Sequence, residues 1–139
     1  MKRILVDTGP LVAIISSQDE HHATCLNALR DMQGPLLSCW PVITEAAWLL
    51  RKSPRAVQQL LCSIDGRFLD VLPLAGAEAK AIAGLMKRYE DIRPQLADAT
   101  LVYLAGREKI ETIFTLDHRD FSIYRSGRRS TFRIVPEIG

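Results

Sequence analysis

The chain has 139 residues, of which 47% are hydrophobic and 24% are charged. This length and composition predict one globular domain over residues 1–139, with enough apolar side chains for a core. The formal net charge of +2 is too small to establish a nucleic-acid partner, but it does not oppose one.

Residues 2–6 are a short apolar run that predicts a strand, and Asp7-Thr8-Gly9-Pro10 stops it. Further helices and strands in the first half of the chain are expected at these places: helices over 11–15 and 19–32, a brief strand at 36–38, and helices over 41–50 and from 53 to about 64. Prolines at the starts of the last two helices fit the first turn of a helix.

The second half continues the alternation, with a strand at 68–72, helices over 76–89 and 97–106, and strands at 112–116 and 132–135. Strands that are separated by helices predict a mainly parallel sheet of about five strands, with helices on both faces. The expected fold class is therefore a three-layer α/β/α sandwich.

Membrane insertion and secretion are not indicated by the sequence. No segment approaches the ~18 apolar residues that a spanning helix needs, and the apolar run after Met1-Lys2-Arg3 is too short for a signal peptide. The cysteines are odd in number and lack C-x-x-C spacing, which predicts buried free thiols at Cys25, Cys39 and Cys62. We therefore expect a cytoplasmic protein.

Four scattered carboxylates are the most informative feature. Asp7 and Asp117 each end an apolar run that predicts a strand, and Glu45 and Asp98 each lie early in a predicted helix. In parallel sheets, ligands bind beyond the carboxyl ends of the strands, where helices begin. Because hard oxygen ligands favour Mg²⁺ or Mn²⁺, a cluster there predicts a metal site suited to phosphoryl transfer.

Each acid also has a structural explanation. Asp7 and Asp98 could cap the helices that follow them, and Asp117 could be a turn residue. Asp98, however, lies in line with the expected buried stripe of its own helix, formed by Leu101, Val102 and Ala105. A carboxylate on such a stripe is costly unless a metal or a helix N-terminus compensates it.

Glu45 lies at the rim of its own helix's expected apolar face, which is formed by Val42, Ala46, Leu49 and Leu50. Trp48 follows three residues later and is expected either to be exposed beside the site, where it could dock a partner, or to pack inside. Trp40, which precedes a proline, is expected to pack.

The segments around the four acids resemble, in order, the signatures of PIN-domain nucleases, which include the VapC-type toxins of toxin–antitoxin pairs. The segments are Ile4 to Leu11, Ile43 to Ala47, Leu96 to Ala99 and Phe114 to Phe121. The resemblance implies that Asp7, Glu45, Asp98 and Asp117 are the catalytic, metal-binding acids, and that Thr8 and Thr115 support them. Asp120 could supplement Asp117 or be an exposed turn residue.

The same resemblance implies a ribonuclease that uses Mg²⁺ or Mn²⁺ to activate water for attack on an RNA phosphodiester. It further implies a cognate antitoxin and a homodimer. The alternatives are an RNA-processing nuclease of this family without an antitoxin, or a catalytically silent binding module. A receiver domain and a haloacid-dehalogenase-type phosphatase fit less well, because the chain lacks an acidic pair and an Asp-x-Asp motif after its first strand.

A basic segment follows the last acid. Its arginines are Arg125, Arg128, Arg129 and Arg133, around Gly127. A solvated surface loop is the ordinary interpretation of such a segment. The alternative is an RNA-binding rim beside the acidic centre, in which Arg125, Arg128 and Arg129 contact phosphates.

Overall fold

The computed structural model describes residues 2–65 and 68–137. Its strands are β1 (Ile4–Val6), β2 (Leu36–Ser38), β3 (Leu69–Val71), β4 (Thr112–Phe114), β5 (Arg125–Ser126), β6 (Ser130–Thr131) and β7 (Arg133–Val135). Its α-helices are α1 (Thr8–Ile15), α2 (His22–Asp31), α3 (Trp40–Leu49), α4 (Pro54–Asp65), α5 (Ala79–Arg88), α6 (Leu96–Glu108) and α7 (His118–Phe121).

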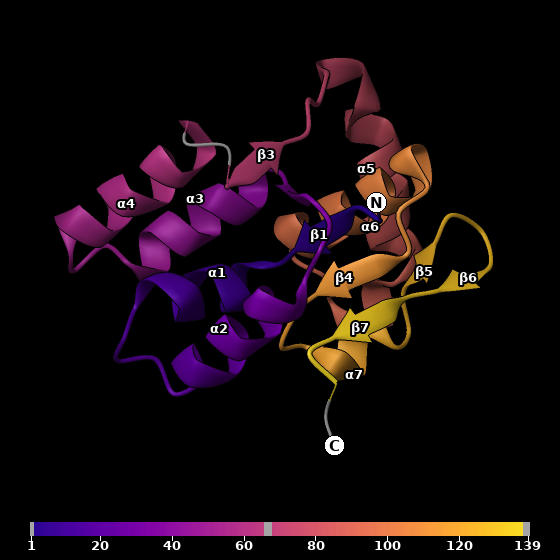
Figure 1. The fold of residues 1–139 in the computed structure, drawn as a ribbon. Coiled ribbons are helices and arrows are strands. Elements are labelled where there is room, and N and C mark those ends of the chain that lie inside the picture. Colours follow the sequence, from indigo (N-terminus) through magenta and orange to yellow (C-terminus); the bar gives the residue numbers. More distant parts are fainter. Residues whose placement is uncertain (1, 66–67, 138–139) are drawn as a thin grey trace.

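The central sheet has five parallel strands in the order β3-β2-β1-β4-β7. Figure 1 shows α1 to α4 grouped on the left, with α5 and α6 behind β1 and β4. The predicted three-layer α/β/α class is therefore confirmed. β5 and β6 form a separate antiparallel hairpin between β4 and β7 in the sequence.

The middle of the sheet is buried because its strands are continuous apolar runs, as is usual when helices cover both faces. All three residues of β1 and of β4 are buried. Helix α6 lies behind these strands, and its buried residues lie on several sides of the helix. They include Leu101, Val102 and Ala105 of the predicted stripe. This packing fixes the carboxyl ends of β1 and β4 beside the first turn of α6.

Several element boundaries differ from the predictions. The helix expected over 11–15 begins at Thr8, because the Asp7 side chain caps it. The helix expected over 76–89 begins as a 3₁₀ turn at Gly76–Glu78, and a second 3₁₀ turn covers Glu90–Ile92. Helix α7 and the β5–β6 hairpin were not predicted, since such short elements carry little periodicity.

Predictions about three single side chains were wrong. Trp40 and Leu49 are each 54% exposed, because the buried face of α3 is turned towards Ile43 and leaves both outside it. Cys62 is exposed, whereas Cys25 and Cys39 are buried free thiols as expected. Burial raises the pKa of the Cys39 thiol to about 12, so it stays neutral near pH 7.

Gly34, just before β2, lies where two segments approach closely. A Cβ atom there would fall 1.6 Å from the carbonyl oxygen of Lys2, so glycine is required. Across the described ranges, the helices are too short or too polar to cross a membrane.

Candidate active site

Asp7 lies directly beyond the end of β1 and is only 8% exposed. Its backbone N–H donates to the carbonyl of Phe114 at 2.8 Å, which ties it to β4. One carboxylate oxygen accepts from the Thr8 backbone N–H at 2.8 Å, and the other accepts from the Thr115 hydroxyl at 2.8 Å. The carboxylate is thus held rigidly at the carboxyl edge of the sheet.

Thr115 links two of the predicted acids. While its hydroxyl donates to Asp7, its oxygen also accepts from the Asp117 backbone N–H at 3.0 Å. The Asp117 carboxylate in turn accepts from the Asp120 N–H at 3.0 Å and caps α7. A buried threonine between β4 and α7 therefore sets the positions of both aspartates.

Asp98 and Glu45 come from helices that adjoin this edge. Asp98 is in the first turn of α6, where its carboxylate accepts from the Gln95 backbone N–H at 3.0 Å. Glu45 is half-buried on α3, which packs against both α1 and α6. The expected cap at Asp7 is therefore confirmed, and Asp98 lies inside α6, in the capping box whose N-cap is Gln95. Asp117, for which a turn residue was the structural alternative, caps α7.

The acids lie close enough to influence one another's protonation. Burial raises the pKa of Asp7 to about 6, and the negative charges of Asp98 and Glu45 add to this effect. Burial also raises the pKa of Asp98, with further contributions from Glu45, Asp117 and Asp120. Mutual repulsion of this kind indicates that these carboxylates share one region of negative charge.

The donor set fits a hard divalent cation. None of the ion pairs formed among the described residues involves Asp7, Glu45, Asp98 or Asp117, and a cation would relieve their repulsion. With the side chains as they stand in 2–65 and 68–137, no three His, Cys, Asp or Glu residues are arranged to hold a metal ion.

Tyr124 was not identified from the sequence. It is 1% exposed, packs edge-on against Tyr89 and Phe121 at ring distances of 5.0 Å, and its hydroxyl has no hydrogen-bond partner in the described part of the chain. Burial raises its pKa, and the charges of Asp98 and Asp120 raise it further. An orphaned phenol near the acids is a candidate functional group, although no sequence motif marks it.

The β5–β6 hairpin of the basic segment lies towards the opposite end of the sheet from the carboxylates. The hydroxyl of Ser126 donates to the carbonyl of Ile110, before β4 begins, and Arg133 pairs with Thr112, the first residue of β4. This is the amino-terminal end of the sheet, opposite the carboxylates. RNA binding by Arg125, Arg128 and Arg129 stays a prediction.

Arg125 is also occupied within the protein. Its guanidinium donates to the backbone carbonyls of Ser122, Ile123 and Tyr124 at 2.8–3.0 Å, next to the end of α7. Arg128 and Arg129, in contrast, are exposed in the turn of the hairpin, where Gly127 adopts a φ of 68°.

Comparison with known proteins gives a consistent result. The PIN domain profile matches residues 4–126. The chain is similar to the ribonuclease VapC26 of Mycobacterium tuberculosis, with 28% identity over 135 residues that cover 96% of this chain and 100% of that protein.

Solved structures share the fold. VapC20 of Mycobacterium tuberculosis, described as a sarcin-ricin loop cleaving toxin, matches with a TM-score of 0.73 and 17% identity over 79% of this chain and 86% of that one. VapBC2 of Rickettsia felis, bound to a promoter DNA fragment, matches with a TM-score of 0.61 and 15% identity over 95% and 98% of the two chains. DNA-bound VapBC of Salmonella typhimurium matches with a TM-score of 0.57 and 21% identity. The match covers 96% of this chain and 97% of that one.

Proposed function

The chain belongs to the PIN domain family, and we propose that it is an endoribonuclease that depends on Mg²⁺ or Mn²⁺. The observation that carries this proposal is the group of carboxylates at the carboxyl edge of the sheet, centred on the buried Asp7. The similarity to a ribonuclease that the chain matches over its full length supports RNA as the substrate.

In this proposal, Asp7, Glu45, Asp98 and Asp117 hold the metal. When bound, the ion supplies hydroxide from water and stabilises negative charge on the phosphodiester. Thr115 keeps the Asp7 and Asp117 carboxylates in position through its two hydrogen bonds. Thr8 fixes Asp7 through its backbone N–H. The N-terminal ends of α1 and α6 face the same edge and favour the binding of anionic groups.

The products of cleavage test this function. Attack by water does not use the ribose 2′-hydroxyl, so the purified protein should cut an RNA and also a copy with a 2′-deoxy group at the scissile position. The products should carry no 2′,3′-cyclic phosphate, and EDTA should stop the reaction until Mg²⁺ or Mn²⁺ is added. Cyclic phosphate ends, or full activity in EDTA, would contradict the proposal.

We further propose that the protein is a cytoplasmic toxin that a cognate antitoxin inhibits. The VapBC names of two structural neighbours support an antitoxin partner, and the exposed Trp48 on α3 offers a contact for it. An RNA-processing nuclease without an antitoxin is the alternative. The presence of a gene for a small regulatory protein immediately upstream favours the toxin, and its absence favours the alternative.

Two finer points accompany this proposal. We expect a homodimer, which sedimentation at several concentrations would detect. We also expect Arg128 and Arg129 to contact RNA phosphates from the hairpin, at the end of the sheet away from the carboxylates.

A further inference from the structure

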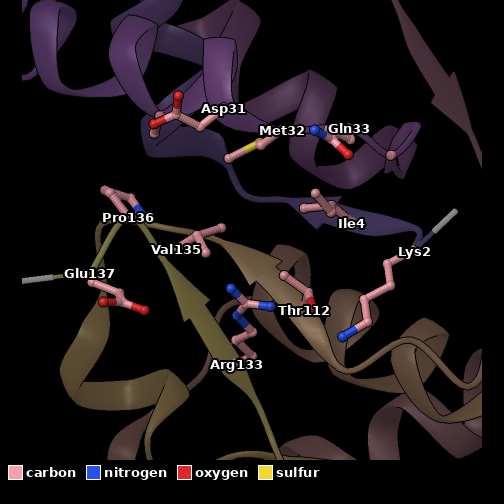
Figure 2. Close-up of a pocket in the computed structure, with 12 residues that line it drawn as sticks. Lys2, Ile4, Asp31, Met32, Gln33, Thr112, Arg133, Val135, Pro136 and Glu137 are labelled. Carbon is pink, nitrogen blue, oxygen red and sulfur yellow. The ribbon is translucent and has the colours of Figure 1, made fainter.

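A depression of about 560 Å³ lies over β1, β4 and β7, on the side where α2 ends. Figure 2 shows it between Met32 and Gln33, which follow α2, and the side chains of Val135 and Thr112. Neither the proposed chemistry nor the predicted antitoxin contact uses this region. It runs from the amino-terminal ends of β1 and β4, where Lys2 and Thr112 lie, to the carboxyl end of β7 at Val135. Lys2 and Thr112 therefore lie at the end of the sheet opposite the carboxylates.

The lining divides into chemically distinct parts. The apolar walls come from Ile4, Ala28, Met32, Val135 and Pro136. In Figure 2, Lys2 and Arg133 lie on either side of Thr112, while Asp31 and Glu137 lie near Pro136 at the other end. One end of the depression therefore carries two positive charges, and the other carries two carboxylates.

A second depression, of about 350 Å³, extends the positive end. It shares Lys2, Thr112 and Arg133 with the first, and adds Arg3, Lys109, Ile110 and Glu111. Its rim thus has four cationic side chains and one carboxylate, and because Arg3 forms an ion pair with Glu108, a surplus of two positive charges remains. Positive charge is therefore concentrated at this end of the sheet, opposite the acidic centre.

We propose that the joined depressions bind one nucleotide of the RNA substrate, at a distance from the scissile phosphate. Lys2 and Arg133 form charge-assisted bonds to its phosphate, and the base lies against the apolar wall of Met32 and Val135. Asp31 or Glu137 accepts from an exocyclic amino group of the base. This inference rests on the proposed RNA-cleaving function, which it deepens by adding a substrate contact.

The distance between Lys2 and Arg133 and the carboxylates means that only a longer RNA can contact both. Lys2 precedes Asp7 by five residues and Thr112 precedes Asp117 by five, which is ~16 Å along extended strands. A strand of several nucleotides is needed to reach from the scissile phosphate to Lys2 and Arg133, so a minimal substrate cannot contact the positive end of the depression.

Chemical-shift perturbation tests the site without any need for cleavage. Adenosine 5′-monophosphate, added to metal-free protein, should shift the backbone amide signals of Gln33, Thr112 and Val135, and Lys2→Ala/Arg133→Ala should abolish these shifts. Inorganic phosphate at the same concentration should shift them much less. Absent shifts, or equal shifts with inorganic phosphate, would overturn the proposal of a nucleotide site.

RNA binding in EDTA gives the second test. Lys2→Ala/Arg133→Ala should weaken binding of a long oligonucleotide at least tenfold, and should shallow the slope of log affinity against log salt by ~0.7 per lost phosphate contact. The control Lys80→Ala/Arg88→Ala removes two exposed charges on α5 and should change binding much less. Equal effects of the two double variants would contradict the inference.

The two proposals fail in different ways. The Lys2/Arg133 variant should cleave a short substrate at the wild-type rate, because the depression does not touch the scissile bond. If the wild type cleaves no RNA, the proposed function fails, yet the nucleotide-induced shifts still decide whether the depression binds nucleotides.

Discussion

Asp7 caps α1 and also lies among the carboxylates that are proposed to hold the metal. The sequence suggested both roles, because an aspartate that separates a strand from a helix fits either one. The sequence could not reveal that the hydroxyl of Thr115, 108 residues away, donates to the same carboxylate. That contact depends on the pairing of β1 with β4.

The raised pKa of Asp7 predicts how the stability of the metal-free protein depends on pH. The pKa rises from 3.8 to about 6 on folding, so the contribution of protonated Asp7 to stability is complete below pH 4 and is lost as the pH rises through 6. Asp7→Asn should therefore increase the free energy of unfolding by about 2–3 kcal/mol at pH 7.5 in EDTA, with no gain at pH 4.

Denaturant unfolding at the two pH values measures this difference. Asp70→Asn, on the exposed side of β3, is the matched control and should show no gain that depends on pH. A loss of stability in Asp7→Asn at pH 7.5 would show that its hydrogen bonds outweigh the burial of charge.

The hydroxyl of Thr115 gives a second prediction for a single residue. Thr115→Val keeps the shape of the side chain but leaves the Asp7 carboxylate and the Asp117 N–H without their partner. We expect a loss of about 1–3 kcal/mol in the free energy of unfolding and slower RNA cleavage. Thr115→Ser retains the hydroxyl and should preserve most of the stability and most of the cleavage rate. Equal defects in Thr115→Ser and Thr115→Val would exclude the hydrogen bonds as the cause.

At the scale of the elements, α3 combines a buried face with exposed aromatic residues. The predicted position of Glu45 at the rim is confirmed, since it is half-buried, but the expected face was displaced because Ile43 replaces Leu49 inside. The periodicity of an almost wholly apolar helix does not specify its rotation. Contacts with α1 and α6 determine it instead.

Trp48 on this helix tests the antitoxin surface. It is 62% exposed, and the Arg51 guanidinium lies 3.9 Å from its ring centre. Trp48→Ala should leave the melting temperature and RNA cleavage unchanged, yet weaken inhibition by the upstream-encoded protein by about tenfold or more, as expected for an aromatic anchor.

Trp40→Ala is the control for this experiment, because Trp40 is similarly exposed, at 54%, on the same helix. It should reduce inhibition less than Trp48→Ala does. Unfolding of the Trp48 variant, or unaltered inhibition, would remove this residue from the partner surface.

At the scale of the whole molecule, the alternation of strands and helices was enough to predict the parallel sheet. It was also enough to predict that Asp7 and Asp117 meet at one edge, because parallel strands end on the same side. The position of the basic hairpin could not be predicted, since its two-residue strands lie outside the alternation. The separation of positive and negative charge between the two ends of the sheet could not be predicted either, because the net charge of +2 does not say where the charges lie.

Four carboxylates from separate parts of the chain, Asp7, Glu45, Asp98 and Asp117, are proposed to form one metal site. The most direct test is a Mn²⁺ titration in which electron paramagnetic resonance measures the free ion. The wild type and the Asp70→Asn control should bind equally. Glu45→Gln and Asp98→Asn should each lower the affinity by about tenfold or more, since even indirect partners of a metal contribute that much. Wild-type affinity in both Glu45→Gln and Asp98→Asn would contradict the claim.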